Sequence, residues 1–423
     1  MRTPGTTLAD ARGSEPSHDR KGVVRVALFL VATTCTAQSF AQRGFLETQF
    51  VGYPQTAPND SGSAIGESLL RYEAFYKLSA GWQFSGGIDA RTDTHRQDER
   101  ALHLSWNDRE TQRPAFEVRR LSAIYHRGPV TIELGKQFIR WGKADILNPT
   151  DRFAPRDFLS VVDNDFLGVT AARLTYERGS ETLDVVWAPL FTPSRIPLFD
   201  QRWFAAPAGL RLVDAGARYP GGSQAGARWN HLGAGYECSL SFYEGFNNLP
   251  LLSVVGTSLP SVYLQRLYPR MRMYGGDAAV PLKLVTVKGE AAYFTSSTPQ
   301  ADDYALYVIQ LERQQGEWMF VGGYAGQAVT RKRQALDFAP DRGLARAFLG
   351  RATWTIDTNR SLAFEAAARQ NGDGVWLKTE YSHALGQHWR VKAAFTLIRG
   401  SPQDFLGQYR RNSHGSLTVR YSF

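Results

Sequence analysis

Few residues of this chain combine the types and spacing that catalysis needs. The segment 412–416 brings together Ser413, His414 and Ser416, and hydrolysis by a serine requires a nucleophile with an adjacent base. Neighbours of this kind are common by chance, and in an extended segment His414 and Ser416 would lie on the same face. We therefore predict no catalytic residue and keep a lipid hydrolase as the weakest alternative.

The segment 140–166 is the second place where reactive side chains gather. Hard cations prefer several oxygen ligands, but the carboxylates of this segment lack the regular spacing of a calcium loop and have arginines beside them. No metal site and no cofactor are predicted. Asp151 is expected to bond nearby backbone amides, and the whole segment to fold into a lumen as a constriction. The residues predicted to form this constriction loop are Asp145, Asn148, Asp151, Arg152, Arg156 and Asp157.

The elements that would position these residues are strands with one oily and one wetted face. From residue 416 to the end, leucine, valine, tyrosine and phenylalanine hold the odd positions, while serine, threonine and arginine hold the even ones. A period of two is typical of a strand with unlike faces. An apolar face opposite a charged one suits a wall between lipid and a wet lumen.

Segments with this period recur along the chain and predict about eighteen strands. The links are tight after even-numbered strands, as at 127–129 and 179–181, and mostly longer after odd-numbered ones, as at 140–166 and 191–222. Membrane barrels alternate in this way because their periplasmic turns are short and their outer loops long. The predicted fold class is an all-β, antiparallel transmembrane barrel of about 18 strands (16–18). The predicted strands are 44–53, 66–77, 81–94, 116–126, 130–139, 167–178, 182–190, 223–233, 236–247, 266–282, 285–297, 302–314, 317–329, 343–357, 360–370, 373–384, 387–398 and 413–423.

Composition agrees with this fold class. The chain is 43% hydrophobic with a mean hydropathy of −0.33, which excludes a bundle of apolar transmembrane helices, yet 12% of its residues are aromatic. A net charge of +9 would suit a nucleic-acid-binding protein, but the basic residues have acidic neighbours and form no run. Nucleic acid is therefore not expected as a partner.

Residues 1–41 are predicted to be a cleaved secretory signal. A basic patch at 20–25 precedes an apolar run, and residues 39–41 have the small-x-small pattern of a cleavage site. Residues 42–423 are then a single barrel domain. Cys238 is the one cysteine of that domain, so no intramolecular disulfide is expected.

One face of the predicted strands carries charges that would line the lumen. Basic residues outnumber acidic ones in this set, and a ring of arginine and lysine would favour anionic solutes. Pairs such as Lys288/Glu290 and Lys378/Glu380 suit instead a ladder of salt bridges that fills the interior without selectivity. Both alternatives stay open. The predicted pore-lining residues are Glu133, Arg173, Arg270, Arg272, Lys288, Glu290, Arg351, Glu365, Arg369, Lys378, Glu380, Arg390 and Lys392.

Aromatic residues near predicted strand ends fit the girdles that lie at the two surfaces of a membrane. Trp141, Trp187, Trp318 and Trp389 are placed in this way. Trp376 is instead a candidate for the lumen face, where it could stack against a carbohydrate.

The segment 135–158 contains the pattern G-x-Q-x-I-x-W-G-x-x-D-x-x-N-P-x-D and resembles an element of uncharacterised Gram-negative outer-membrane barrel families. The segments 186–197 and 268–277 look like members of the same group, and the layout is similar to porins of the alginate-export type. The resemblance implies a barrel and a pore but no particular solute. The final strand, with Tyr421 and Phe423, is similar to the signal that the barrel-assembly machinery reads.

Together these features predict an outer-membrane channel and not an enzyme. It would act as a diffusion pore or exporter for a small solute or polymer, with anionic ones favoured. The expected partners are outer-membrane lipid, lipopolysaccharide and the assembly machinery, and a homo-oligomer stays open. The main alternative is a structural or assembly barrel whose lumen is filled by loops.

Overall fold

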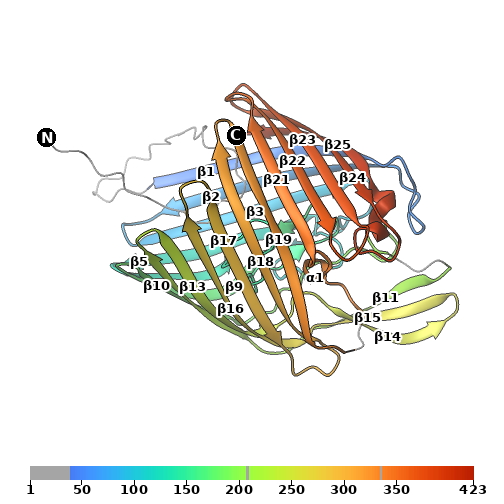
Figure 1. Ribbon diagram of the computed structural model, residues 1–423, viewed down its shortest axis with the longest axis horizontal. Coiled ribbons are helices and arrows are strands. Elements are labelled where there is room, and N and C mark those ends of the chain that lie inside the picture. The colour runs from blue at the N-terminus through green and yellow to red at the C-terminus, as the bar shows by residue number, and fades with distance from the viewer. Residues whose placement is uncertain (1–38, 206–208, 334–335) are drawn as a thin grey trace.

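The dominant element of the computed structural model, which describes residues 39–205, 209–333 and 336–423, is a closed β-barrel (Figure 1). Eighteen strands form the ring, each paired antiparallel with its neighbours. The ring closes between its first and last strands, where Phe45 lies opposite Ser422. The strands of the wall are β1 (Ser39–Gly52), β2 (Ala64–Lys77), β3 (Trp82–Asp93), β5 (Phe116–Arg127), β6 (Val130–Gln137), β9 (Val169–Arg178), β10 (Glu181–Ala188), β12 (Gln224–Gly233), β13 (Tyr236–Phe246), β16 (Arg270–Pro281), β17 (Thr286–Thr295), β18 (Asp303–Gln315), β19 (Trp318–Arg331), β21 (Ala347–Thr355), β22 (Arg360–Arg369), β23 (Val375–Leu385), β24 (Trp389–Arg399) and β25 (His414–Ser422).

The predicted fold class is confirmed, and each predicted strand overlaps one strand of the ring. A two-residue strand, β4 (Leu104–Ser105), runs parallel to β5 and extends the sheet to 19 strands without joining the ring. The predicted leader lies outside the described residues except for 39–41, which begin β1 and pair with 75–77 of β2.

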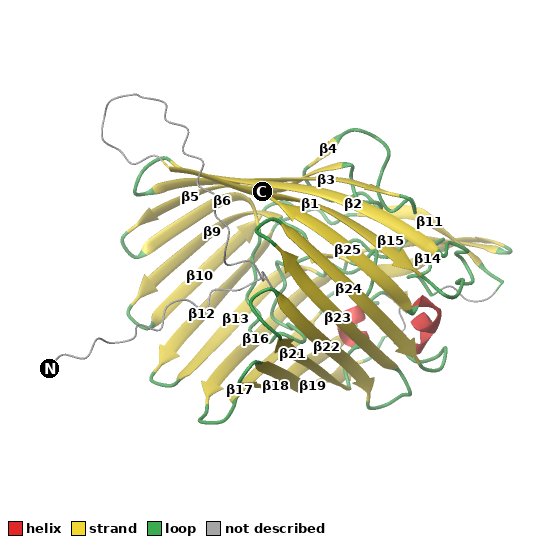
Figure 2. Ribbon diagram, turned by 90° about the horizontal axis from the view of Figure 1, so that it is seen from above, coloured by secondary structure: helices red, strands yellow, loops and turns green. Residues whose placement is uncertain are grey.

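The two ends of the barrel differ in the length of their loops, as the sequence predicts. At one end the turns are tight: Gly128 and Gly179, with φ of +56° and +61°, begin two-residue turns. At the other end are the long loops, which carry the remaining short elements (Figures 1 and 2). Among the described residues, no helix is long and apolar enough to cross a membrane. The elements of the long loops are β7 (Arg156–Asp157), β8 (Asp165–Phe166), β11 (Arg211–Arg218), β14 (Leu251–Ser258), β15 (Ser261–Leu267), β20 (Leu336–Asp337), α1 (Pro340–Gly343) and η1 (Gly407–Asn412).

The outer face of the wall is apolar. Leu240, Phe348 and Ile309 are 64%, 58% and 56% exposed although they lie within regular strands. Only a hydrocarbon surrounding makes such exposure favourable over a whole sheet, and a sheet in lipid must close so that every backbone group is paired. The wall therefore has the surface of a membrane-spanning barrel.

Aromatic rings collect on the outer face at the tight-turn end. The rings of Trp318 and Trp354 stack with centroids 5.6 Å apart, and those of Trp389 and Tyr421 lie 4.9 Å apart. This is the placement expected of an interfacial girdle. The prediction is wrong for Trp141, which is 3% exposed and lies inside the barrel, where its indole N–H donates to Asp184.

A charge placed on this outer face tests the lipid-facing assignment. Ile309→Arg, at the middle of β18, should destabilise the folded barrel by ~2–4 kcal/mol, because the guanidinium would lie at the centre of the bilayer. Leu385→Arg, at the end of β23, is the matched control and should cost about 0–1 kcal/mol. Unfolding in urea from lipid vesicles measures both, and equal costs at the two positions would contradict the assignment.

Candidate functional site: the lumen and its inward loop

The inner face of the wall is lined by charged side chains that pair with one another. On β23, Leu377 and Tyr381 are exposed on the outer face, while Lys378 and Glu380 alternate with them on the lumen side. Lys392 of β24 approaches Glu380 to 3.7 Å. The arrangement is a ladder of cross-strand ion pairs more than a ring of basic groups. The predicted pore-lining residues that lie on the lumen side are Glu133, Arg173, Lys288, Glu290, Arg351, Glu365, Arg369, Lys378, Glu380, Arg390 and Lys392.

The prediction is wrong for Arg270 and Arg272, which lie on the outer face. Their side chains are 61% and 55% exposed and both pair with Glu244 of β13. The intervening Met271 and Met273 are buried inside the barrel. The apolar side chains of a loop fill the lumen here and pack on the two methionines, so the arginines take the opposite face.

The loop between β6 and β9, residues 138–168, folds into the lumen and is called the inward loop below. Its Trp141 and Phe153 pack edge to face, 5.3 Å apart, and Phe153 meets Tyr243 of β13 at 5.0 Å. Phe294 of β17 belongs to the same buried cluster. One side of the lumen is therefore a packed apolar core rather than open water.

Glu290 of β17 is the main polar anchor of the inward loop. Its carboxylate accepts hydrogen bonds from the backbone amides of Lys143 (2.9 Å), Ala144 (3.1 Å) and Thr150 (2.9 Å), and from the Thr150 hydroxyl (2.8 Å). Buried amides need a partner, and a carboxylate is a strong one. A glutamate on the wall thus does for the loop what a neighbouring strand does within the sheet.

The aspartates of the inward loop serve its folding. Asp151 accepts from the amides of Trp141 and Gly142 at 2.5 and 2.6 Å, as the sequence predicts. Asp145 lies 3.1 Å from the ammonium of Lys288, and its amide donates to Gln310 of β18 at 2.9 Å. Asn148 donates its side-chain amide to the carbonyl of Ala144. Each of these three side chains thus has a partner within the protein.

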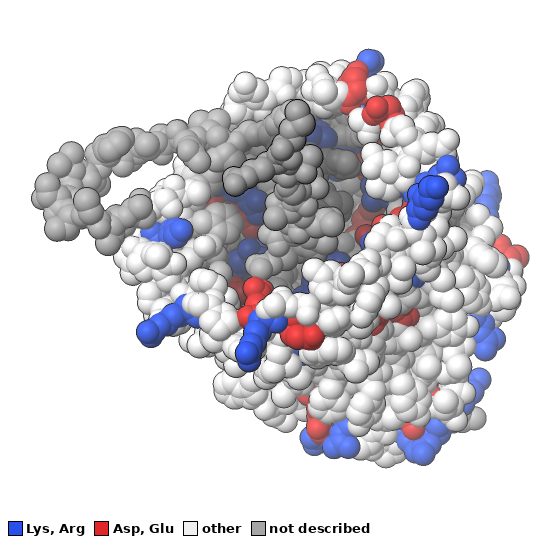
Figure 3. Space-filling view, turned by 60° about the vertical axis from the view of Figure 1, so that its left-hand side comes forward, with Lys and Arg blue, Asp and Glu red and all other residues white. Residues whose placement is uncertain are grey.

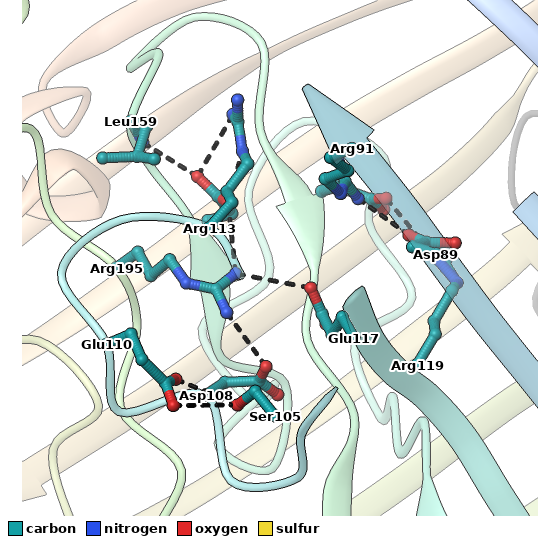
Figure 4. Close-up of polar contacts among 12 residues, drawn as sticks. Asp89, Arg91, Ser105, Asp108, Glu110, Arg113, Glu117, Arg119, Leu159 and Arg195 are labelled. Atoms are coloured by element: carbon teal, nitrogen blue, oxygen red, sulfur yellow. Dashed lines mark hydrogen bonds and ion pairs between the residues drawn. The ribbon is translucent and has the colours of Figure 1, made fainter. Parts of the chain in front are cut away.

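A buried ion cluster joins the inward loop to the rim of the barrel (Figure 4). Arg195 lies 3.3 Å from Asp157, 3.7 Å from Glu117 and 2.9 Å from Asp108. Arg113 adds a 2.8 Å contact to Asp157. Burial opposes the charge of Asp157, but Arg113 and Arg195 overcome it and hold its pKa well below the usual range. The cluster ties three outer loops to the beginning of β5.

A β-bulge brings into the lumen an arginine pair that alternation alone does not predict. The register of β5 against β3 shifts between Gly87 and Ile88, so that Arg119 is the extra residue of the bulge, beside Arg120. Both guanidinium groups lie over the ring of Phe138, at 4.7 and 5.0 Å. The sequence does offer a signal for this bulge, which is the two consecutive arginines within a predicted strand. Without a bulge, one of them would point into lipid.

The inward loop divides the remaining space into two cavities. The first, of about 420 Å³, lies toward β1, β2, β3 and β5 and is lined mostly by charged groups; we call it the charged cavity. The second, of about 660 Å³, lies toward β19, β21, β22 and β23 and is lined largely by apolar groups; we call it the apolar cavity. Val162 and Asn164 of the loop line both. Seen from the tight-turn end, charged side chains gather in the hollow of the barrel while the wall around it is mostly uncharged (Figure 3).

His414 and Ser416, the weak hydrolase candidate, lie on the inner face of β25. His414 is 4% exposed, and its Nδ1 donates to the carbonyl oxygen of Asn412 at 2.8 Å. Its ring packs near Tyr53 and Trp203, at 5.3 and 6.3 Å. The imidazole is thus part of the packing between β25 and two outer loops.

Solved structures with the same architecture are outer-membrane porins. The BenF-like porin of Pseudomonas fluorescens Pf-5 aligns with a TM-score of 0.55 and 8% identity, over 91% of this chain and 98% of the porin. OccAB4 of Acinetobacter baumannii gives 0.53 and 9%, over 92% and 99%. The outer membrane protein opdK of Pseudomonas aeruginosa gives 0.53 and 8%, over 91% and 98%. No protein-family model and no curated protein matches the sequence. The chain therefore has the fold of an outer-membrane porin.

The rim loop 94–115 should loosen as the pH rises, because of Asp98. This side chain is 3% exposed and its Oδ1 has no hydrogen-bond partner among the described residues. Burial, opposed by Arg113, raises the pKa of Asp98 from 3.8 to about 7. The folded loop thus holds the proton more tightly than the opened loop, so its stability is greatest below pH 3.8 and falls until the pH passes about 7.

Hydrogen exchange of residues 94–115 at pH 5 and pH 8, corrected for intrinsic rates, measures this effect. Opening should become easier at pH 8 by roughly 1–3 kcal/mol, and Asp98→Asn should remove the difference. Asp357→Asn, in an exposed turn, is the control and should leave it unchanged. A wild-type loop equally protected at both pH values would contradict the assignment.

Proposed function

We propose that this protein is a passive channel of the outer membrane for small solutes. The observation that carries the proposal is the charged cavity beside the inward loop, inside a closed wall with an apolar outer face. A barrel whose interior is wetted and narrowed by a loop selects solutes by width and by the charge that lines it. The porin fold supports the same function.

The lining of the charged cavity supports a weak preference for cations. The excess of basic residues in the whole chain does not extend to this cavity, where acidic groups are the more numerous. Because most of them face an arginine or lysine, the remaining field is small and the preference modest. The basic lining residues are Arg91, Arg113, Arg119 and Lys378, and the acidic ones are Glu47, Asp89, Glu117, Asp157, Asp163, Asp165 and Glu365.

A structural barrel with a filled lumen is the second candidate, and one observation favours it. Side chains from several outer loops, among them Phe158, Phe199, Leu249 and Tyr409, form a buried apolar cluster against the wall. A cluster of this kind narrows the outer mouth. It leaves the charged cavity beside it, which is why the channel remains our first proposal.

We propose that the protein is not an enzyme, that lipid and lipopolysaccharide surround its wall, and that the assembly machinery reads its C-terminal strand. The backbone of Phe423 pairs with Gly44 at 2.9 and 3.0 Å, so the proposed signal also closes the ring.

Conductance separates the channel from the filled barrel. The refolded protein in a planar bilayer should give stable single-channel steps in potassium chloride. In a salt gradient the reversal potential should be small and have the sign of a cation preference. Lys378→Gln should shift it further toward cations, since one positive group leaves the cavity. Correctly folded but silent protein would contradict the channel, and a strong anion preference would contradict the assignment of the charged cavity.

A further inference from the structure

The apolar cavity sets this barrel apart from a simple water-filled pore. On the wall side it is lined by Val321, Leu349, Trp376 and Ile398, and the inward loop adds Phe158. The interior of a diffusion channel is ordinarily polar, because water and hydrated solutes fill it. An apolar lining in the lumen has a cost unless something other than water covers it.

The cavity has the dimensions and form of a small-molecule site. Its volume is about 660 Å³, within the range of ligand pockets. Its lining joins an apolar patch to charged groups of both signs, which are the basic Arg152, Arg156 and Arg351 and the acidic Asp145, Asp151, Glu317, Asp341 and Glu365. It extends from the turn between β18 and β19, at Gly316, to the outer loops at Leu406. At the outer end it meets the buried cluster that includes Phe158 and Tyr409.

The opposite side of the cavity, formed by the inward loop, carries polar groups. Arg156 donates to the side-chain oxygen of Asn164 at 3.0 Å, and its guanidinium lies over the ring of Phe166 at 4.3 Å. No carboxylate of the described residues comes within ion-pair distance of Arg156, although most other lumen arginines have one. Arg152, also on the lining, lies 3.9 Å from Asp341 and over the ring of Phe294 at 5.0 Å.

A half-buried guanidinium without an anionic partner indicates that the partner comes from outside the chain. An isolated charge in an apolar surrounding is unfavourable, and an acidic ligand would compensate it with charge-assisted hydrogen bonds. Arg156 is well suited to bind such a ligand. Asn164 and Phe166 hold its planar guanidinium in place, and N–H groups that do not bond Asn164 are left to donate to an acid.

We propose that the apolar cavity binds an amphipathic solute, with a bulky apolar body against β21, β23 and β24 and one acidic headgroup at Arg156. The inference rests on the proposed channel function for its biological sense, since the lumen must be open for a solute to reach the apolar cavity. The site itself is a property of the lumen and is testable without any current.

Binding of adamantane-1-carboxylate to the detergent-solubilised, folded protein tests the proposal by calorimetry. The acid should bind, and adamantane-1-methanol, which has the same body without the charge, should bind at least ~10-fold more weakly. Acetate, which has the headgroup alone, should not bind measurably. Equal affinity for acid and alcohol, or no binding of the acid, would overturn the proposal.

Two variants locate the site. Arg156→Gln should weaken the acid by ~10-fold or more and leave the alcohol unchanged. Val321→Trp, which fills the cavity from the wall and changes no residue of the inward loop, should abolish binding of both. It keeps the proposal testable if Arg156→Gln fails to fold. Arg390→Gln, a lumen variant outside this cavity, is the control and should bind like wild type. Unchanged binding in Val321→Trp would overturn the assignment to this cavity.

These outcomes are independent of those for the channel. Binding without conductance would remove the channel and keep the site, whereas conductance without binding would remove the site and keep the channel.

Discussion

Every backbone amide withdrawn from water needs a partner, and this constraint organises the whole molecule. In the wall the partner is the next strand, so the ring must close, and β1 pairs with β25 to do so. In the lumen the inward loop has no neighbouring strand over residues 143–150. Glu290 supplies the missing acceptor for three of its amides, and Asp151 for two more. The closed wall and the inward loop are two solutions to one problem.

The inward loop turns one lumen into two unlike compartments. Its apolar side chains pack on Tyr243 and Phe294, while two of its aspartates pair directly with Arg113 and Lys378 in the lining of the charged cavity. Selection of solutes would then depend on a wall of side chains contributed by a single segment. Because that segment is anchored by several independent contacts, its position should be stable on the timescale of solute passage.

Much of the fold could be predicted from the sequence, because lipid on one side and water on the other impose a period of two on every strand. The alternation of short and long links likewise predicted which end of the barrel carries the tight turns. The errors have physical causes. Arg270 and Arg272 alternate with Met271 and Met273, so hydropathy assigns the arginines to the wet lumen. The apolar side chains of the inward loop pack on the two methionines instead, and this reverses the two faces.

The contacts of the site were less predictable, because they join residues far apart in the chain. Thr150 and Glu290 are 140 positions apart, and nothing in either local sequence indicates that they meet. Trp141 is of the residue type that girdles favour and lies near a strand end, as girdle residues do. Only its surroundings distinguish it, because Asp184 accepts its indole N–H inside the barrel. The charge density of residues 140–166 did predict an inward loop, since such a segment needs partners, but not which partners.

Hydrogen exchange of the inward loop in the folded, detergent-solubilised barrel is the most direct measurement of this account. The amides of Lys143, Ala144 and Thr150 should exchange as slowly as wall amides and should lose that protection in Glu290→Ala, while Glu380→Ala leaves it intact. Exchange of these three amides in the wild type at the rate of a free loop would contradict an anchored loop that divides the lumen.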